Sequence, residues 1–420
     1  MKINVYGSGL SAWVAAACLA RVGNDVVICE GSQGKDKPLN KIAVICDELG
    51  LLHELEQQID SGRLTRSAYM PAPVAGIHWV ALESSEQETV VQIVRGLQEG
   101  EQSDVLIINQ CNFMVGATAE LQSLLADKGD VVYIPDNLQE GVALQGFSQP
   151  VRIILGLDRD HALIKIRAVL RPFSTRLDAL QLMSSREAEF TKFAITGMLA
   201  IRLGYVNELA NLADRLGVDI SVVQEGMGAD PRIGPHYLSA GCGFGGQNFH
   251  SYISRFSGIF QEERQQSLLK RVIDENEVQK ELLFRKLWQH FNGKLAGKVI
   301  AFWGASFKPG TASIDNAPSL KIIDALISQG ACVNVHDPEA MINLKEHYGE
   351  ESLITYCETA MSAAEEADAL LLVTEWSLYW SPDYQKLSET MREPLVIDGR
   401  NIFDKEMMLE NGFTYLGVGR

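Results

Sequence analysis

The first residues with a clear chemical use are two glycines near the start of the chain. Gly7 and Gly9 form a GxGxxA motif with Ala12, and the motif directly follows the apolar residues 2–6. Such glycines let the backbone turn tightly and approach a pyrophosphate, and the alanine lets a helix pack closely on a strand. Glu30 ends the next apolar stretch, where a carboxylate can accept hydrogen bonds from a ribose diol. The agreement of strand, glycines, helix and acid predicts a dinucleotide-binding unit.

Charged residues toward the other end of the chain suggest a second binding site. Lys308, Glu375 and Arg400 each come just after a predicted strand. Ligands of doubly wound sheets bind beyond the carboxyl ends of the strands, and the planar guanidinium of arginine matches a phosphate. Each of these charges taken singly also fits an ordinary solvated surface. Two cations at one sheet edge favour a pocket for an anion.

A third candidate, Lys192, lies in a long helix predicted from residue 184 to residue 216. The helix starts with a capping box formed by Ser184 and Glu187. Apolar residues occur on nearly every face of this helix, so it must be buried on more than one side. We expect it to form a spine between two lobes and to pair with a second copy of the chain in a homodimer. A lysine buried there without a function would be costly, which favours a role for Lys192.

The order of apolar segments predicts the elements that position these residues. Strands at 78–82, 105–108 and 131–134 alternate with helical segments, and the alternation restarts with strands at 299–303, 332–336, 369–374 and 395–398. Such alternation indicates parallel sheets covered on both faces. The predicted fold class is α/β. Two doubly wound Rossmann-like domains, residues 1–183 and 297–420, are joined by the long central helix and a small helical region, residues 184–296.

Composition limits the classes of partner. The 420 residues are 46% hydrophobic and carry a formal net charge of −17, which argues against nonspecific binding to nucleic acid or to an anionic membrane. The seven cysteines form no CxxC pair and the histidines form no i,i+4 pair, so no metal site is predicted. The longest apolar run, residues 12–20, is too short to span a bilayer. We expect a cytoplasmic protein with reduced thiols.

Over essentially its whole length the chain resembles the UDP-glucose/GDP-mannose dehydrogenase family. The matching segments are SGRL (61–64), ADPRIGPHYLSAGCGFGG (229–246), SFKPGT (306–311), NAPSL (316–320), DP (337–338), TEW (374–376), DGRN (398–401) and GVGR (417–420). The resemblance implies NAD on the first lobe, a UDP-sugar against the last lobe, and pairing through the central helix. It also implies oxidation of the C6 alcohol of the sugar to a carboxylate by two NAD, through a cysteine that captures the aldehyde.

The resemblance carries individual roles onto positions of this sequence. It places NAD against Gly7, Gly9, Ala12, Glu30, Lys35 and Ser84. It gives Lys192 the task of deprotonating the reacting hydroxyl, and it implies catalytic carboxylates at Asp136 and Glu140. The loop that wraps the sugar supplies Tyr237, Gly241, Gly243, Phe244 and Gly245, and the substrate-binding cations are Lys308, Arg400 and Arg232, the last of which reaches the neighbouring subunit.

The sequence departs from the family pattern at the reacting residues. Asn248 stands where the family has its nucleophilic cysteine, Tyr252 replaces the aspartate that works with the lysine, and Thr196 replaces an asparagine. An amide is not nucleophilic, so Asn248 cannot form the covalent intermediate. Asp315 occupies the position of an arginine that approaches NAD, which predicts weakened NAD binding.

Three activities stay open at this point. A complete oxidation would need another thiol, and Cys242, six residues before Asn248, is the candidate. An altered dehydrogenase would stop at a partial reaction. A noncatalytic UDP-sugar or NAD binder would act as a regulatory or partner subunit. We therefore predict a protein of the UDP-glucose 6-dehydrogenase type with lost or altered catalysis.

Overall fold

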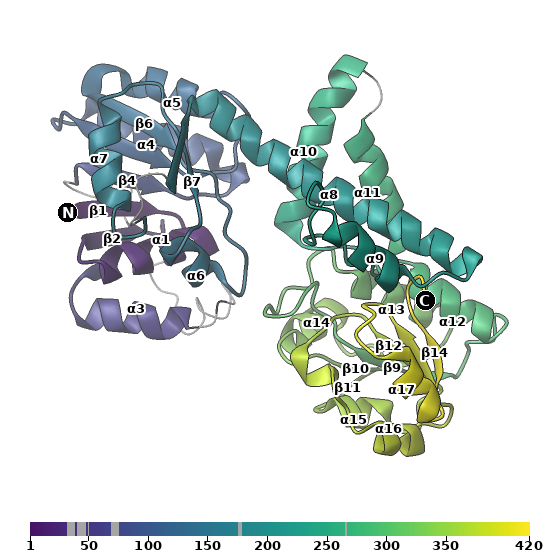
Figure 1. Ribbon diagram of the computed structural model, residues 1–420. Helices are drawn as coiled ribbons and strands as arrows, with labels where there is room; N and C mark the ends of the chain where they lie inside the picture. The colour runs from purple at the N-terminus through teal and green to yellow at the C-terminus, as the bar shows by residue number, and fades with distance from the viewer. Residues whose placement is uncertain (32–37, 40–47, 49, 69–74, 175–178, 265–266) are drawn as a thin grey trace. The chain divides into compact units, whose positions relative to one another are not determined.

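The computed structural model describes residues 1–31, 38–39, 48, 50–68, 75–174, 179–264 and 267–420. This described chain divides into two compact units, Met1–Ala194 and Ile195–Arg420 (Figure 1). Each unit contains a twisted sheet with helices on both of its faces. The predicted α/β class with two Rossmann-like domains is confirmed.

The first unit is built on a sheet that has eight strands within the described residues, in the order β3-β2-β1-β4-β5-β6-β7-β8. Their bounds are β1 (Lys2–Tyr6), β2 (Asp25–Cys29), β3 (Leu64–Ser67), β4 (Ile77–Val80), β5 (Val105–Asn109), β6 (Gly129–Tyr133), β7 (Ile153–Gly156) and β8 (Leu180–Met183). The strands from β3 to β6 pair in parallel, as predicted for all of them except β3, which the sequence did not predict. Strand β7 differs because it runs antiparallel to β6, an arrangement that needs no crossover of the sheet.

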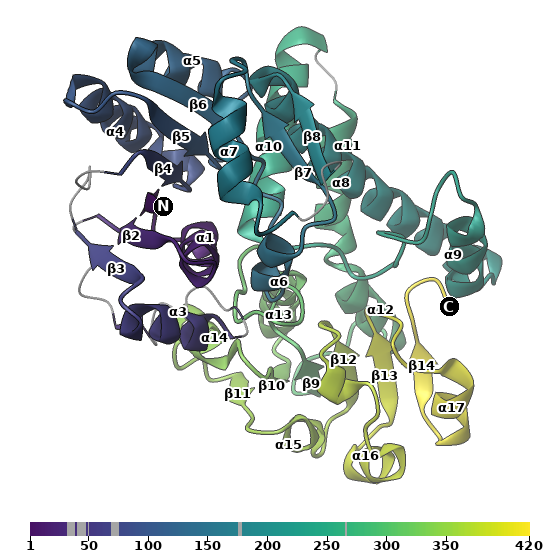
Figure 2. The same ribbon diagram turned by 60° about the vertical axis from the view of Figure 1, so that its left-hand side comes forward.

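Helices cover both faces of this first sheet (Figure 2). One core contains side chains of α1 (Leu10–Arg21), α3 (Leu51–Asp60), α6 (Ala143–Ser148) and α7 (Ala162–Leu170). The opposite core contains side chains of α4 (Gln87–Glu99) and α5 (Ala117–Leu125). Helix α1 is buried at every residue from Ala12 to Ala20, and its alanines let it lie close against the strands. The short 3-10 helices are η1 (Ser84–Glu86) and η2 (Ala126–Lys128).

The second unit contains a sheet with six strands in its described residues, ordered β11-β10-β9-β12-β13-β14. The strands are β9 (Val299–Trp303), β10 (Cys332–His336), β11 (Ile354–Tyr356), β12 (Ala369–Leu372), β13 (Leu395–Asp398) and β14 (Thr414–Leu416), and neighbours pair in parallel. One face packs against α12 (Leu282–His290), α13 (Pro318–Ser328) and α14 (Met341–Tyr348). The other packs against α15 (Ala360–Ala364), α16 (Tyr384–Thr390) and α17 (Lys405–Glu410). A 3-10 turn, η4, covers Ser377–Tyr379.

The remaining helices are α8 (Ser185–Leu216), α9 (Ile220–Ala229), α10 (Gln247–Arg264) and α11 (Leu268–Gln279). The predicted capping box at the start of α8 is confirmed, because Ser184 N donates to Glu187 at 2.8 Å and Glu187 N donates to Ser184 Oγ at 3.3 Å. In the second unit α8 leaves apolar side chains exposed, with Met198 58% and Tyr205 53% accessible. Among the described residues, no helix has the length and apolar character needed to cross a membrane.

Candidate functional site

The turn between β1 and α1 has the geometry of a phosphate-binding loop. Gly7 has a φ of +139°, and a Cβ added to it would lie 2.3 Å from the carbonyl oxygen of Ala81, so only glycine fits there. A Cβ added to Gly9 would have no atom within 4 Å, so the backbone at Gly9 faces open space. Gly9 is also the N-cap of α1 and brings no capping side chain. The N–H groups of a first helical turn lack intrahelical partners and attract an anion.

The acid at the end of β2 is held by a neighbouring arginine. The two oxygens of Glu30 accept hydrogen bonds from Arg66, from Nε at 2.6 Å and from a terminal nitrogen at 2.9 Å. The Glu30 side chain is only 1% exposed. The carboxylate that the sequence assigns to a ribose is therefore already engaged by a cation of the same unit. Arg66 was not predicted as a site residue, and it lies 36 positions away on β3.

Side chains from three segments of the first unit meet beyond β6. Ser11 Oγ, in the first turn of α1, donates to Asp136 at 2.6 Å. The Lys192 ammonium, on α8, donates to the side-chain oxygen of Asn137 at 3.3 Å. Burial lowers the pKa of Lys192, and the Asp136 carboxylate acts against this shift. Glu140 lies half-buried in the same loop.

Of the candidate catalytic residues, Asp136 thus lies beside the helix of the glycine turn, and Lys192 interacts with Asp136 and its neighbour Asn137. Ser11 and Asn137 complete this group and were not predicted, although Asn137 directly follows Asp136 in the sequence. Ser84 is exposed at the start of η1, just after β4. Lys35 lies outside the described residues.

The N-terminus of another helix at the same sheet edge is capped by a carboxylate of the protein. Helix α5 follows β5, and its N-terminal groups Gly116 N and Thr118 N donate to Glu189 at 2.6 and 2.8 Å. Glu189 is buried on α8. Because this carboxylate already takes the anion position at α5, the turn before α1 is the better place for a phosphate.

In the second unit, the glycine-rich loop around residues 239–246 is fixed by amide side chains of two helices. Asn207, on α8, accepts a hydrogen bond from Gly241 N at 2.9 Å, and Gln279, on α11, donates to Gly241 O at 2.7 Å. Asn276 forms a pair of 2.9 Å hydrogen bonds with the N–H and carbonyl groups of Phe244. These contacts fix the backbone of the loop. Because its glycines have no side chains, a ligand could approach that backbone closely.

The same loop is tied to the carboxyl edge of the second sheet. Cys242 N donates to Gly399 O at 3.0 Å, and Gly246 N donates to Asp315 O at 2.8 Å. Arg400 is largely buried here, with its Nε donating to Val373 O at 2.7 Å and lying 3.1 Å from a Glu375 carboxylate oxygen. The structure therefore brings the loop, Arg400 and Glu375 together, and the anion pocket formed by Lys308 and Arg400 stays a prediction.

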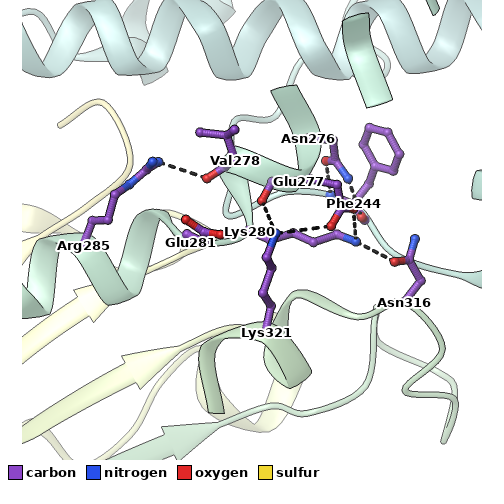
Figure 3. A network of polar contacts seen from close by, with 9 residues as sticks. All are labelled: Phe244, Asn276, Glu277, Val278, Lys280, Glu281, Arg285, Asn316 and Lys321. Atoms are coloured by element: carbon purple, nitrogen blue, oxygen red, sulfur yellow. Dashed lines mark hydrogen bonds and ion pairs between the residues drawn. The ribbon is translucent and has the colours of Figure 1, made fainter. Parts of the chain in front are cut away.

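A buried lysine joins this loop region to the turn before α13 (Figure 3). The Lys280 side chain is 2% exposed, and its ammonium donates to Glu277 and to the side-chain oxygen of Asn316, both at 2.7 Å. A Cβ added to Gly243 would lie 3.0 Å from Cγ of Lys280. Burial lowers the pKa of Lys280, and Glu277 acts against this shift. Lys280 was not predicted as a site residue, although Asn276 and Lys280 share one helical face by their i,i+4 spacing.

Three other predicted binding residues of the second unit have side chains that are half-buried or exposed. Lys308 is half-buried, with its ammonium 5.7 Å from the centre of the Phe307 ring. Arg232 is 86% exposed and pairs with Asp230 at 2.6 Å. Tyr237 is 38% exposed and has a φ of +59°.

The position of the expected nucleophile lies at the start of α10. Asn248 is the second residue of this helix and is exposed, whereas Tyr252, one turn later, is buried. The nearby thiol of Cys242 is fully buried, and it donates to Val373 O at 3.7 Å. Burial raises the pKa of Cys242, which disfavours the thiolate that nucleophilic attack requires.

The backbone N–H groups of the glycine turn after β9 are already bound by a carboxylate of the protein. Gly304 has a φ of +90°, and the following amides Ala305 N and Ser306 N both donate to one oxygen of Asp337, at 2.7 and 2.9 Å. Asp337 is 2% exposed at the end of β10. The carboxylate therefore takes the donors that a pyrophosphate would use, so this second turn is not an open phosphate site.

Comparisons with known proteins agree with this geometry. Three domain models of one family, UDP-glucose/GDP-mannose dehydrogenases, match the chain: the NAD-binding domain over residues 1–174, the central domain over 186–278 and the UDP-binding domain over 301–405. The chain is 34% identical over 442 residues to a UDP-glucose 6-dehydrogenase of Pseudomonas aeruginosa, covering 100% of this chain and 98% of that protein. It is 31% identical to the UDP-glucose 6-dehydrogenase TuaD of Bacillus subtilis, covering 100% and 93%.

A solved structure extends the likeness to three dimensions. The UDP-glucose dehydrogenase of the hyperthermophilic archaeon Pyrobaculum islandicum superposes with a TM-score of 0.84 and 26% identity, covering 100% of this chain and 97% of that one. The chain therefore belongs to the UDP-glucose/GDP-mannose dehydrogenase family of nucleotide-sugar dehydrogenases.

Proposed function

We propose that this protein binds a UDP-sugar and NAD but does not carry out the full oxidation of the sugar alcohol to the acid. The observation that carries this proposal is that no reactive thiol is found at the start of α10 or in the described loop before it. Asn248 presents a carboxamide at the exposed start of the helix, and the neighbouring Cys242 thiol is buried with a raised pKa. Neither group supplies the nucleophile that a covalent aldehyde adduct needs.

Retained UDP-sugar binding in the second unit is supported by its loop contacts. The glycine-rich loop is held by Asn207, Asn276 and Gln279, and Arg400 lies beside it. A guanidinium binds a diphosphate through charged hydrogen bonds. We assign Tyr237, Gly241, Gly243, Phe244, Gly245, Lys308 and Arg400 to the substrate, and Arg232 to the substrate of the partner subunit.

NAD binding in the first unit is supported by Gly7 and Gly9. When bound, NAD supplies the acceptor for a hydride. Lys192 is the candidate base for the sugar hydroxyl, because a lowered pKa increases its neutral fraction, and Asp136 lies beside it to balance its charge after proton uptake. We propose that NAD binds weakly, since Glu30 is engaged by Arg66 and Asp315 adds negative charge.

The same observations give two forms of the proposal. A partial enzyme would stop at the aldehyde after one hydride transfer, for which Lys192 and Asp136 suffice. A noncatalytic subunit would bind the nucleotides and act through a partner chain. The exposed apolar side chains of α8, including Met198 and Tyr205, favour a homodimer in either form.

The functional division that we propose is residues 1–183 for NAD, 184–296 for dimerisation and 297–420 for the UDP-sugar. Reduced, unpaired cysteines such as Cys18 and Cys242 favour a cytoplasmic location.

The test follows NADH absorbance with UDP-glucose and NAD, with products identified by mass. One NADH per sugar supports the partial enzyme, and no NADH with calorimetric binding of UDP-glucose supports the noncatalytic subunit. Two NADH per sugar would overturn the proposal and make Cys242 the nucleophile. No binding of UDP, UDP-glucose or a UDP-N-acetyl sugar would show that the second unit has lost its ligand.

A further inference from the structure

Glu375 follows β12 at the carboxyl edge of the second sheet, in a segment that its two neighbours hold in place. The Thr374 hydroxyl donates to Ser306 O, and Trp376 Nε1 donates to the Ser306 hydroxyl at 3.1 Å. The indole N–H of Trp380 donates to the carbonyl oxygen of Glu375, also at 3.1 Å. Because none of these contacts uses the carboxylate of Glu375, the position of this residue does not depend on its charge.

The Glu375 carboxylate lies at one edge of the Arg400 guanidinium. Nε of Arg400 is 3.1 Å from Glu375 Oε2, but its hydrogen is donated to Val373 O at 2.7 Å. Glu375 Oε2 is buried and accepts no hydrogen bond from a described residue, so the two side chains interact through their charges. A Cβ added to Gly241 would lie 3.0 Å from Nη1 of Arg400, so the guanidinium also packs against the glycine-rich loop.

Both charged groups keep hydrogen-bonding capacity for a ligand. Within the part of the chain that the structure describes, the terminal nitrogens of Arg400 and the second oxygen of Glu375, Oε1, form no hydrogen bond. The Arg400 side chain is 16% exposed and that of Glu375 is 35% exposed. The pair therefore combines donors and an acceptor beside a loop whose glycines let a ligand approach.

A diphosphate can use only the arginine of this pair. An ionised carboxylate accepts hydrogen bonds but donates none, and it repels a phosphate at close range. A hydroxyl group is a donor that suits it. In a nucleotide sugar the diphosphate is attached to the ribose on one side and to the second sugar on the other. A guanidinium that binds the diphosphate therefore brings the carboxylate beside it close to a sugar hydroxyl.

We propose that Glu375 is a further ligand-binding residue, whose carboxylate accepts a hydrogen bond from a sugar hydroxyl of the nucleotide sugar while Arg400 binds the diphosphate. This inference rests on the proposed function, because it takes Arg400 as the residue that binds the diphosphate. The hydroxyl belongs either to the ribose or to the second sugar, and the experiment separates these two sources.

The experiment measures dissociation constants by calorimetry on the full-length protein with UDP-glucose, UDP and a dideoxy-UDP. The dideoxy-UDP keeps the uracil and the diphosphate but has neither ribose hydroxyl nor a second sugar, and a weak ligand is measured by displacement of UDP. Glu375→Ala should reduce the preference for UDP-glucose over dideoxy-UDP by about tenfold or more, the effect of one hydrogen bond to a charged group. Removal of the negative charge acts on all three diphosphates alike, so the ratio isolates the hydroxyl.

The behaviour of UDP identifies the hydroxyl. If UDP loses its preference over dideoxy-UDP as UDP-glucose does, the hydroxyl is on the ribose. If only UDP-glucose loses it, the hydroxyl is on the second sugar. Glu358→Ala is the matched control, because Glu358 is an exposed carboxylate just after β11, at the outer edge of the same sheet, and its removal should leave the ratios unchanged.

A second variant keeps the test valid if the loss of the carboxylate beside Arg400 prevents folding. Glu375→Gln preserves the volume and one acceptor oxygen, and a neutral acceptor binds a hydroxyl less tightly than a carboxylate does. The preference for UDP-glucose over dideoxy-UDP should then fall by about three- to fivefold, less than in Glu375→Ala.

Two results would overturn the inference alone. One is a change of the same factor for all three ligands, which would mean that Glu375 acts only through Arg400. The other is an unchanged affinity for UDP-glucose in the Glu375 variants. If the unmodified protein binds none of the three ligands, the UDP-sugar part of the proposed function fails instead, so the two failures are distinguishable.

Discussion

Substituting Glu277 by alanine should destabilise the second unit more than substituting its partner Lys280 by methionine. The reason is the unequal burial of the two charges, because the Lys280 side chain is 2% exposed and that of Glu277 is 38% exposed. Glu277→Ala leaves a buried ammonium with only the neutral oxygen of Asn316, and uncompensated buried charges cost about 3–5 kcal/mol. Lys280→Met keeps the packed methylenes and leaves Glu277 near solvent, still beside Lys321 (Figure 3), so we expect a loss of about 1–2 kcal/mol.

The measurement is the free energy of unfolding from urea titration. Glu281→Ala is the matched control, because Glu281 also pairs with Lys321, at 3.2 Å, whereas the hydrogen bonds of the Lys280 ammonium go to Glu277 and Asn316. This control removes an exposed pair and should cost at most about 1 kcal/mol.

The pH dependence supplies a second criterion. Burial lowers the pKa of Lys280 in the folded state, so between the folded and the unfolded pKa the unfolded chain binds more protons, and stability increases with pH. Loss of Glu277 lowers the pKa of Lys280 in the folded state further. At pH values below that pKa, the buried ammonium then costs more free energy. The cost of Glu277→Ala should therefore be smaller at a pH of about 9.5 than at about 7. The reasoning would be refuted if Lys280→Met lost more free energy of unfolding than Glu277→Ala, or if the loss for Glu277→Ala were the same at both pH values.

Three further predictions address binding, catalysis and assembly. Arg400→Ala should weaken UDP binding by about 1.5–3 kcal/mol in calorimetry, the worth of hydrogen bonds to a charged group, whereas Arg271→Ala on the exposed face of α11 should not, and equal affinities would remove Arg400 from the site. Asn248→Cys together with Tyr252→Asp should produce NADH from UDP-glucose where Asn248→Cys alone does not, because groups that act as a unit are not additive. If the single variant is as active as the double one, Tyr252 has no part in the loss. Met198→Glu should convert a dimer into a monomer in light scattering, and a folded monomer formed by the unmodified protein would contradict the homodimer.

Sequence predicted the fold where strands are buried on both faces. Strands β9 and β10 were predicted with the bounds that the structure gives. Strand β9 is a continuous apolar run, VIAFW, whereas β10, CVNVH, also contains Asn334 and His336. Strands β7, β11 and β14 were not predicted, and neither were the edge strands β3 and β8. Their residues, LTRS and LQLM, are half-exposed at the sheet edges, so they lack the apolar pattern that identifies a strand.

From the local order of residues alone, without the family resemblance, the site was predictable where its residues are close in sequence. Gly7, Gly9 and Glu30 follow from the local order of strand, turn and helix. The contacts of Glu30 with Arg66 and of Lys280 with Asn316 join residues 36 positions apart in each case, so they depend on strand register and helix packing. Asn316 also has a φ of +51°. Asparagine tolerates this conformation, but the sequence does not predict it.

The carboxylate of Asp337 has a consequence for how ligands stabilise the protein. The turn after β9 is satisfied internally, so its order does not depend on any bound molecule. The turn before α1 has no capping side chain, so its N–H groups can bind an anion. A ligand that binds the native state alone raises the stability of the part that holds it. Added dinucleotide should therefore slow hydrogen exchange in the first unit, around β1 and α1, and leave exchange around β9 unchanged.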